Sequence, residues 1–234
     1  MPVRLRSVAF ASDDPAAVAT FWASLLGRQV IQDGHGVLVP GNDTQLGLRV
    51  VPSRAERTDV NRMHVHLTST SLEHQQFTVA TALELGARHL DVGQRPDEGH
   101  VVLADPAGNE LCVIEPGNSF LADCGFLGEL ACHGSRDVGV FWSAALDWPL
   151  VWDQDEETAI QSPQGGTKVA WGGPSVRPVD AMETQHFELV VMARDLAAEV
   201  DRLVALGAAR QDDGRDEVVV LTDPDDVEFR VFTG

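Results

Sequence analysis

The chain has little cysteine, little positive charge and no long hydrophobic run, and each shortage excludes a class of protein. Its three cysteines, Cys112, Cys124 and Cys132, follow no metal-finger or redox spacing, which favours a reducing compartment. Lysine and arginine together number 17 against 36 aspartate and glutamate residues, which gives a formal net charge of −19. Such an acidic chain is a poor partner for nucleic acid or for an anionic membrane surface, and we interpret the charge as aiding solubility.

Hydrophobic segments are short throughout. No stretch approaches the roughly 20 apolar residues of a membrane span, and the beginning of the sequence lacks the apolar run of a signal peptide. We therefore expect a soluble, cytoplasmic protein with no membrane partner. A hydrophobic content of 44% over 234 residues is normal for a globular core and is enough for one large or two ordinary domains.

Four short motifs occur twice, in the same order and about 120 residues apart. The pairs are Phe21-Trp22 with Phe141-Trp142, His64-Val65-His66-Leu67 with His186-Phe187-Glu188-Leu189, Leu85-Gly86-Ala87 with Leu206-Gly207-Ala208, and Asp105-Pro106-Ala107-Gly108 with Asp223-Pro224-Asp225-Asp226. This agreement indicates a tandem duplication. We predict one domain over residues 1–116, a Pro-Gly-Asn-containing linker over 117–126, and a second domain over 127–234.

Each half has patterns for a strand, a helix and three strands, and has them twice. Asp14 followed by Pro15 predicts a helix start, and apolar residues at helical spacing from Val18 to Leu26 give that helix one buried face. The plan recurs throughout the chain, which predicts an α+β protein of four βαβββ modules. One module leaves a sheet face open, whereas two paired modules make a curved mixed sheet whose concave side suits a ligand.

The motifs resemble those of the glyoxalase/bleomycin-resistance/extradiol-dioxygenase superfamily, also called the vicinal oxygen chelate family. The resemblance covers almost the whole chain, twice, and rests on the Phe-Trp helix, the strand at His64 and the Asp-Pro-x-Gly-Asn turn. It implies that the four modules pair into two glyoxalase-like domains with curved mixed sheets. It does not imply one reaction, because the family includes lyases, dioxygenases, epimerases and binding proteins.

The resemblance also implies where a metal would bind, on the first and last strands of each paired module. Carried onto this sequence to within about one strand step, the positions are Val8, Arg49, His64 and Cys112 in the first half and Gly128, Trp171, His186 and Arg230 in the second. Cys112 and Arg230 stand where the family usually has a glutamate, so each half keeps one histidine. Because a catalytic divalent metal needs about three protein ligands, we expect no cofactor and retain a divalent metal only as the alternative.

Strand alternation predicts which side chains share a cavity. The expected lining of the first cavity is His64, His66, Glu110 and Cys112, with Arg49 and His100 close by. In the second cavity His186 shares a face with Glu188, and we hypothesise a Glu188–Arg230 ion pair in place of the metal. Trp171 would line an apolar pocket or a domain interface. The plain alternative is that the histidines bond to neighbouring strands and that Cys112 only fills the core.

Three functions remain open at this point. The missing ligands favour a protein that binds, or also transforms, a small apolar or aromatic metabolite without the usual metal. The alternative is a divalent-metal-dependent lyase or dioxygenase with a non-standard ligand set around His64. A third hypothesis is a structural module whose acidic surface recruits a partner. A tandem chain supplies its own second domain, so we expect a monomer or a homodimer.

Overall fold

The structure is a computed structural model that describes residues 3–53, 61–95, 97–173, 185–192, 195–211 and 218–233. Four modules follow one another along the chain, each with one helix and four strands. Module 1 comprises β1 (Val3–Ser12), α1 (Pro15–Leu26), β2 (Ile31–Asp33), β3 (Gly36–Val39) and β4 (Gly47–Pro52). Module 2 comprises β5 (Met63–Leu67), α2 (Leu72–Glu84), β6 (Arg88–His89), β7 (Val101–Ala104) and β8 (Glu110–Val113).

The second half repeats this order. Module 3 comprises β9 (Leu127–His133), α3 (Arg136–Leu146), β10 (Leu150–Gln154), β11 (Glu157–Gln161) and β12 (Lys168–Gly172). Module 4 comprises β13 (Gln185–Val191), α4 (Leu196–Leu206), β14 (Ala209–Gln211), β15 (Val218–Thr222) and β16 (Glu228–Thr233). The predicted α+β class and the four βαβββ modules are confirmed.

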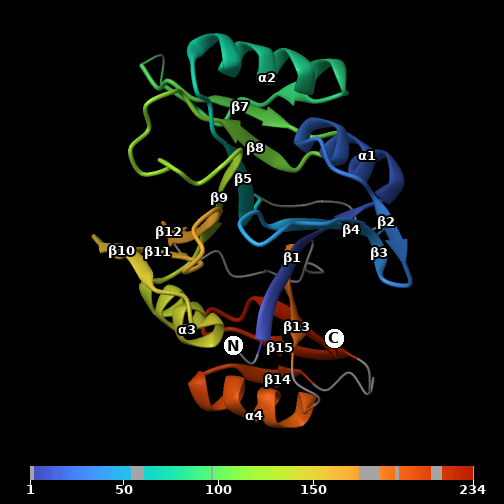
Figure 1. Cartoon of the computed structure of the whole chain (residues 1–234), viewed down its shortest axis with the longest axis vertical. Coiled ribbons are helices and arrows are strands. Elements are labelled where there is room, and N and C mark those ends of the chain that lie inside the picture. The colour runs from blue at the N-terminus through green and yellow to red at the C-terminus, as the bar shows by residue number, and fades with distance from the viewer. Residues whose placement is uncertain are drawn as a thin grey trace.

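The modules pair across the two halves of the sequence. Sheet A has the order β14-β15-β16-β13-β1-β4-β3-β2 and joins modules 4 and 1, whereas sheet B has the order β10-β11-β12-β9-β5-β8-β7-β6 and joins modules 3 and 2. In each sheet the modules meet through their antiparallel first strands, β1 with β13 and β5 with β9. Figure 1 shows module 2 at the top, module 4 at the bottom, and modules 1 and 3 side by side between them.

Pairing across the halves was not foreseen from the sequence, which grouped the modules within each half. Each sheet contains strands from both halves of the sequence. The division into domains at residues 116 and 127 therefore stays a prediction. The predicted linker is a turn-rich segment, and two of its side chains, Leu121 and Cys124, are buried against Cys112 and its neighbours.

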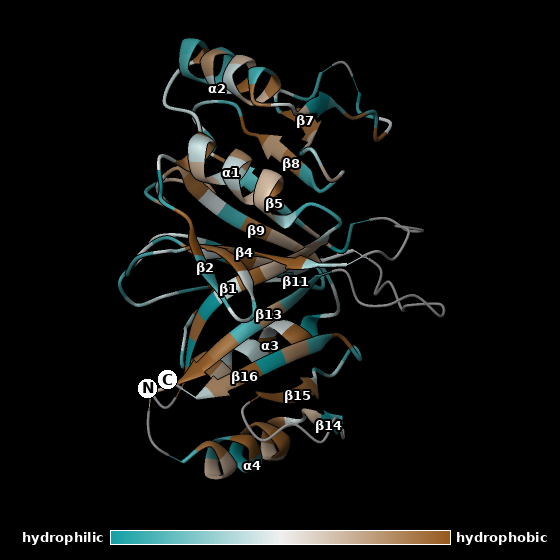
Figure 2. Ribbon diagram, turned by 90° about the vertical axis from the view of Figure 1, so that its right-hand side faces the viewer, coloured by the Kyte–Doolittle hydropathy of each residue, from teal (hydrophilic) through white to brown (hydrophobic). Residues whose placement is uncertain are grey.

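Helix α1 begins where the sequence predicts, and the helices pack on one side of each sheet. Asp14, Ser71 and Asp195 accept hydrogen bonds from backbone N–H groups in the first turns of α1, α2 and α4. In Figure 2 hydrophobic segments are most continuous along the strands, where apolar side chains facing the helices form the core. Among the described residues, no helix is long and apolar enough to cross a membrane.

The duplicated Phe-Trp and Asp-Pro motifs meet in space. The indole nitrogen of Trp22 donates to the Asp105 carboxylate at 3.0 Å, and that of Trp142 donates to Asp223 at 3.2 Å. All four residues are buried. Because Trp22 lies on α1 and Asp105 lies between β7 and β8, the bond ties module 1 to module 2, and its copy ties module 3 to module 4. Indole–carboxylate bonds therefore join the modules of one half, while the sheets join the halves.

Candidate functional site

The strand registers identify equivalent positions on the two modules of each sheet. In sheet A, Ser7 lies opposite Glu188 and Ala9 lies opposite His186, so Ser7 and His186 occupy equivalent places. In sheet B, His64 lies opposite Ala131 and His66 lies opposite Glu129, which makes His64 and Glu129 equivalent. Last-strand partners follow from the parallel pairs Ala9–Arg49, Glu188–Arg230, His66–Cys112 and Ala131–Ala170.

These registers correct three of the positions inferred from the family resemblance. The structural set is Ser7, Arg49, His186 and Arg230 in sheet A, and His64, Cys112, Glu129 and Ala170 in sheet B. Val8, Gly128 and Trp171 each lie one residue from the equivalent position, and a one-residue shift moves a side chain to the opposite face of the sheet. Trp171 is buried and stacks on Trp142 of α3, with ring centroids 6.4 Å apart, and it also lines the cavity beside sheet B that is described below.

The concave side of sheet A holds an ion-pair network centred on Arg49. This side chain is fully buried, and its Nε donates to Glu188 Oε2 at 2.6 Å. Its two terminal nitrogens donate to Asp33 at 2.7 and 3.0 Å, and the Ser7 hydroxyl donates to Glu188 Oε2 at 2.6 Å. Burial alone would lower the pKa of Arg49, but the bonds and charges of Asp33 and Glu188 raise it above the usual value.

Two predictions about these arginines are wrong. Arg49 does not lie beside His64, and Glu188 does not form an ion pair with Arg230. Arg49 lies in the other sheet because β1 pairs with β13 and not with β5. Glu188 is paired by Arg49, which reaches it from β4. Arg230 instead donates to Glu228 at 2.8 Å, and its side chain is 38% exposed.

A divalent metal does not fit sheet A. The guanidinium groups of Arg49 and Arg230 stand at two of the four positions, and a cation there repels a second cation. His186 is 2% exposed, and its Nε2 has no hydrogen-bond partner among the described residues. Burial, with the charges of Arg230 and Arg49, lowers the pKa of His186 to about 3, so this imidazole is neutral.

The concave side of sheet B gathers the predicted polar residues. His64, His66 and Cys112 each place one potential ligand atom within 4.8 Å of the others. Glu129 completes the group, because its Oε2 lies 2.6 Å from His66 Nδ1. In this bond the imidazole nitrogen donates, since a carboxylate only accepts. Glu110 and His100 lie close enough for their charges to act on this cluster.

Glu129 was not predicted from the sequence as a member of this cluster, although it bonds His66 and lines the adjoining cavity. It is the only acidic residue in the apolar strand β9. The alternation of side chains along β9 could have identified it, because Leu130 belongs to the core and Glu129 must therefore lie on the opposite face of the sheet.

Burial favours the uncharged forms of His64 and Cys112 in the sheet B cluster. Desolvation, together with the charges of His66, His133 and His100, lowers the pKa of His64 to about 3. Desolvation and the neighbouring carboxylates Glu110 and Glu129 raise the pKa of Cys112 to about 12. The cluster thus presents a neutral imidazole and a protonated thiol, which is not a nucleophile.

The residues of sheet B do fit a divalent metal. Two imidazoles and a thiol are a donor set that suits zinc and related transition metals, and binding would deprotonate the thiol. The bond from His66 to Glu129 is the carboxylate–imidazole arrangement that orients metal-binding histidines. The fourth position, Ala170, offers no ligand atom and would leave that side of a bound ion open.

A cavity of about 650 Å³ adjoins this cluster. Its lining combines polar groups with aromatic rings and includes His64, Glu129, His133, Lys168, Phe120 and Trp152. The rings of Phe120 and Trp152 meet edge to face with centroids 5.9 Å apart, and Trp152 is 39% exposed. The cavity lies on the concave side of sheet B, where a ligand would contact both the aromatic wall and the histidine cluster.

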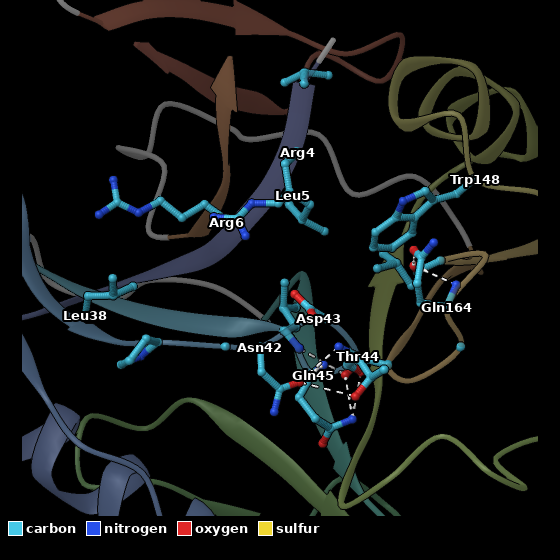
Figure 3. Close-up of a pocket in the computed structure, with 18 residues that line it drawn as sticks. Arg4, Leu5, Arg6, Leu38, Asn42, Asp43, Thr44, Gln45, Trp148 and Gln164 are labelled. Carbon is cyan, nitrogen blue, oxygen red and sulfur yellow. Dashed lines mark hydrogen bonds between the residues drawn. The ribbon is translucent and has the colours of Figure 1, made fainter. Parts of the chain in front are cut away.

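A second cavity, of about 590 Å³, lies where modules 1 and 3 meet. Figure 3 shows the loop of Asn42, Asp43, Thr44 and Gln45 below the start of β1, with Trp148 and Gln164 at the side. Polar groups of this loop are already bonded: Asn42 accepts from the backbone of Thr44 and Gln45, and the Gln45 amide donates to the Cys124 carbonyl at 2.8 Å. We interpret this cavity as a seam between modules and place the candidate site in sheet B.

Comparisons with known proteins agree with this architecture. The family model described as a glyoxalase-like domain matches residues 7–114 and again residues 129–232. The chain belongs to this family. The tandem glyoxalase-like fold, with the landmarks of each half, is thus confirmed.

Solved structures share the fold over the whole tandem. Glyoxalase I from Zea mays aligns with a TM-score of 0.66 at 11% identity, over 99% of this chain and 92% of that one. A putative dioxygenase from Bacillus subtilis aligns with a TM-score of 0.62 at 12% identity, over 98% of this chain and 84% of that one. A search of curated proteins finds no significant match. At these identities the likeness concerns the fold alone.

Proposed function

We propose that this glyoxalase-like protein binds a small aromatic or apolar metabolite on the concave side of sheet B, without a metal. The observation that carries the proposal is the cavity of about 650 Å³ between the aromatic wall and the histidine cluster. Its volume falls within the range of about 300–1,000 Å³ that is typical of small-molecule sites. Trp152 supports the proposal, because its partly exposed ring lies in the cavity wall and is free to pack on a ligand.

The contacts in sheet A support a binding site in sheet B and not in sheet A. Its concave side is occupied by buried charges that satisfy one another, and Arg49 has no exposed surface to offer a ligand. We assign sheet A a scaffold role and sheet B the binding role. A monomer or homodimer is in keeping with this assignment, because each sheet is completed within one chain.

Calorimetric titration of the full chain with indole, a neutral aromatic probe, tests the proposal. We expect saturable binding that Trp152→Ala weakens at least about tenfold, since the substitution removes most of one aromatic wall. Phe77→Ala is the matched control, because Phe77 is 69% exposed on α2, away from the cavity lining. Equal binding by wild type and Trp152→Ala would contradict the proposal.

A second function has its own supporting observation, the approach of His64, His66 and Cys112 to within 4.8 Å. In this alternative the protein is a divalent-metal-dependent lyase or dioxygenase. The metal would be held by these three residues and would supply Lewis-acid activation of a bound oxygen atom. Glu129 would fix the orientation of His66, and the aromatic wall would position the substrate and exclude water.

Metal analysis of protein purified without a histidine tag separates the two functions. The binding proposal predicts substoichiometric metal. Stoichiometric metal that is lost in His64→Ala and retained in His186→Ala would establish the alternative. His186 is the matched control because it is the equivalent histidine in sheet A.

A further inference from the structure

Lys168 stands out in both composition and position. It is the only lysine in a chain whose lysine and arginine residues total 17. It begins β12 and lies in register with Glu129, so its side chain points to the concave side of sheet B. It lines the cavity there and is the only lysine or arginine to do so among the described residues.

The ammonium group of Lys168 is held against the aromatic wall. Its Nζ lies 4.2 Å from the centroid of the Phe120 ring, which is a cation–π contact. It also donates a hydrogen bond to the Phe120 carbonyl oxygen. Phe120 contacts Trp152 edge to face, so one cation and two rings form a continuous part of the wall.

Among the described residues, no carboxylate forms an ion pair with Lys168. Its register neighbour Glu129 is bonded to His66 instead. By contrast, Arg49 is paired with Glu188 and Arg136 is paired with Asp153. A half-buried ammonium with a carbonyl and a ring as its neighbours keeps donor capacity for an external anion.

We infer that the ligand of the sheet B cavity is a small aromatic acid whose ring packs on Trp152 and whose anionic oxygens pair with Lys168. This inference rests on the proposed function and narrows it to one ligand class. The ammonium is a compact charge with three donors, which suits a carboxylate or phenolate oxygen. The chain's net charge of −19 repels anions at long range, so a preference for an anion has to arise locally at Lys168.

The test compares benzoate with benzamide, which has nearly the same shape but no charge. Titration calorimetry at pH 7 with the full chain should give benzoate an affinity at least about tenfold higher than benzamide, as expected for one charge-assisted hydrogen bond. Lys168→Met should abolish this preference, so that benzoate and benzamide bind the variant with similar affinities. Arg88→Met is the matched control, because Arg88 is exposed on β6 at the far edge of the same sheet.

Each other outcome overturns the inference. Equal affinities in wild type, or a preference that survives Lys168→Met, would refute the aromatic acid while leaving the aromatic cavity intact. Binding of neither probe to wild type would refute both the inference and the proposed function.

A second readout does not require a variant to fold. Reductive ¹³C-methylation of wild type labels one lysine side chain, apart from the amino terminus, and preserves its charge. The Lys168 resonance should shift with benzoate and not with benzamide. A resonance unaffected by saturating benzoate would contradict the inference.

Discussion

Replacing Arg49 with methionine should destabilise the protein strongly, because it leaves a buried charge without a partner. Arg49 is fully buried, Glu188 is 1% exposed, and they are joined at 2.6 Å. Asp33, the other partner, is 27% exposed and can be solvated by water when the guanidinium is gone. Glu188 is too deeply buried to be solvated in this way, and among the described residues the Ser7 hydroxyl is the hydrogen-bond donor that remains. Breaking a buried pair in this way costs about 3–5 kcal/mol.

Chemical unfolding in urea, followed by tryptophan fluorescence, measures this loss. Thermal unfolding gives a second measure of the same loss. For a chain of this size, 1 kcal/mol of stability corresponds to about 2–4 °C in Tm, so the Tm of Arg49→Met should be roughly 10 °C lower than that of wild type. The double variant Arg49→Met with Glu188→Met should recover much of the stability, because it removes the stranded charge as well.

Arg230→Met provides the matched control. Its pair with Glu228 is partly exposed, and such pairs contribute about 0–1 kcal/mol. The reasoning would be refuted if Arg49→Met were no more destabilising than Arg230→Met, or if the double variant were less stable than Arg49→Met alone.

Three further predictions follow from the buried polar groups. Trp22→Phe removes a donor to a buried carboxylate and should cost about 1–3 kcal/mol in urea unfolding; a loss below about 0.5 would contradict the role given to this bond. Burial lowers the pKa of His186 to about 3, so the folded state binds its proton less readily than the unfolded state, and stability falls as pH drops from about 6.5 towards 3. His186→Asn should flatten that decline, and unchanged pH dependence would count against it. Burial raises the pKa of Asp223 to about 6, so its contribution has the opposite sign and is lost as pH rises from about 4 to 6. The loss of stability caused by Asp223→Asn, relative to wild type, should therefore be smaller at pH 7 than at pH 4. Unfolding curves at these two pH values measure it.

The module plan could be predicted from the sequence because its signals are local. Asp14 caps a helix within one turn, and helical spacing brings Phe21 and Trp22 to the core whatever lies beyond. The pairing of the strands, in contrast, could not be predicted from local signals. β1 and β5 are both apolar first strands, and nothing local decides whether β1 pairs with β5 or with β13.

The candidate site was predictable to the same extent. His64, His66 and Cys112 meet because they lie on neighbouring strands of one module, β5 and β8. Glu129 comes from the partner module, so its contribution depends on a pairing that the sequence does not encode locally. The bond between Arg49 and Glu188 depends in addition on the reach of a long side chain across β1.

The most direct test of the central claim is a ¹H–¹⁵N spectrum of the five tryptophan indole groups during titration with indole. Trp152 reports on the sheet B cavity, Trp148 on the seam between modules 1 and 3, and Trp22 on the core. Binding in sheet B predicts that the Trp152 signal shifts with saturation while those of Trp148 and Trp22 stay in place. A shift of Trp148 with an unmoved Trp152 would contradict the account and move the site to the seam.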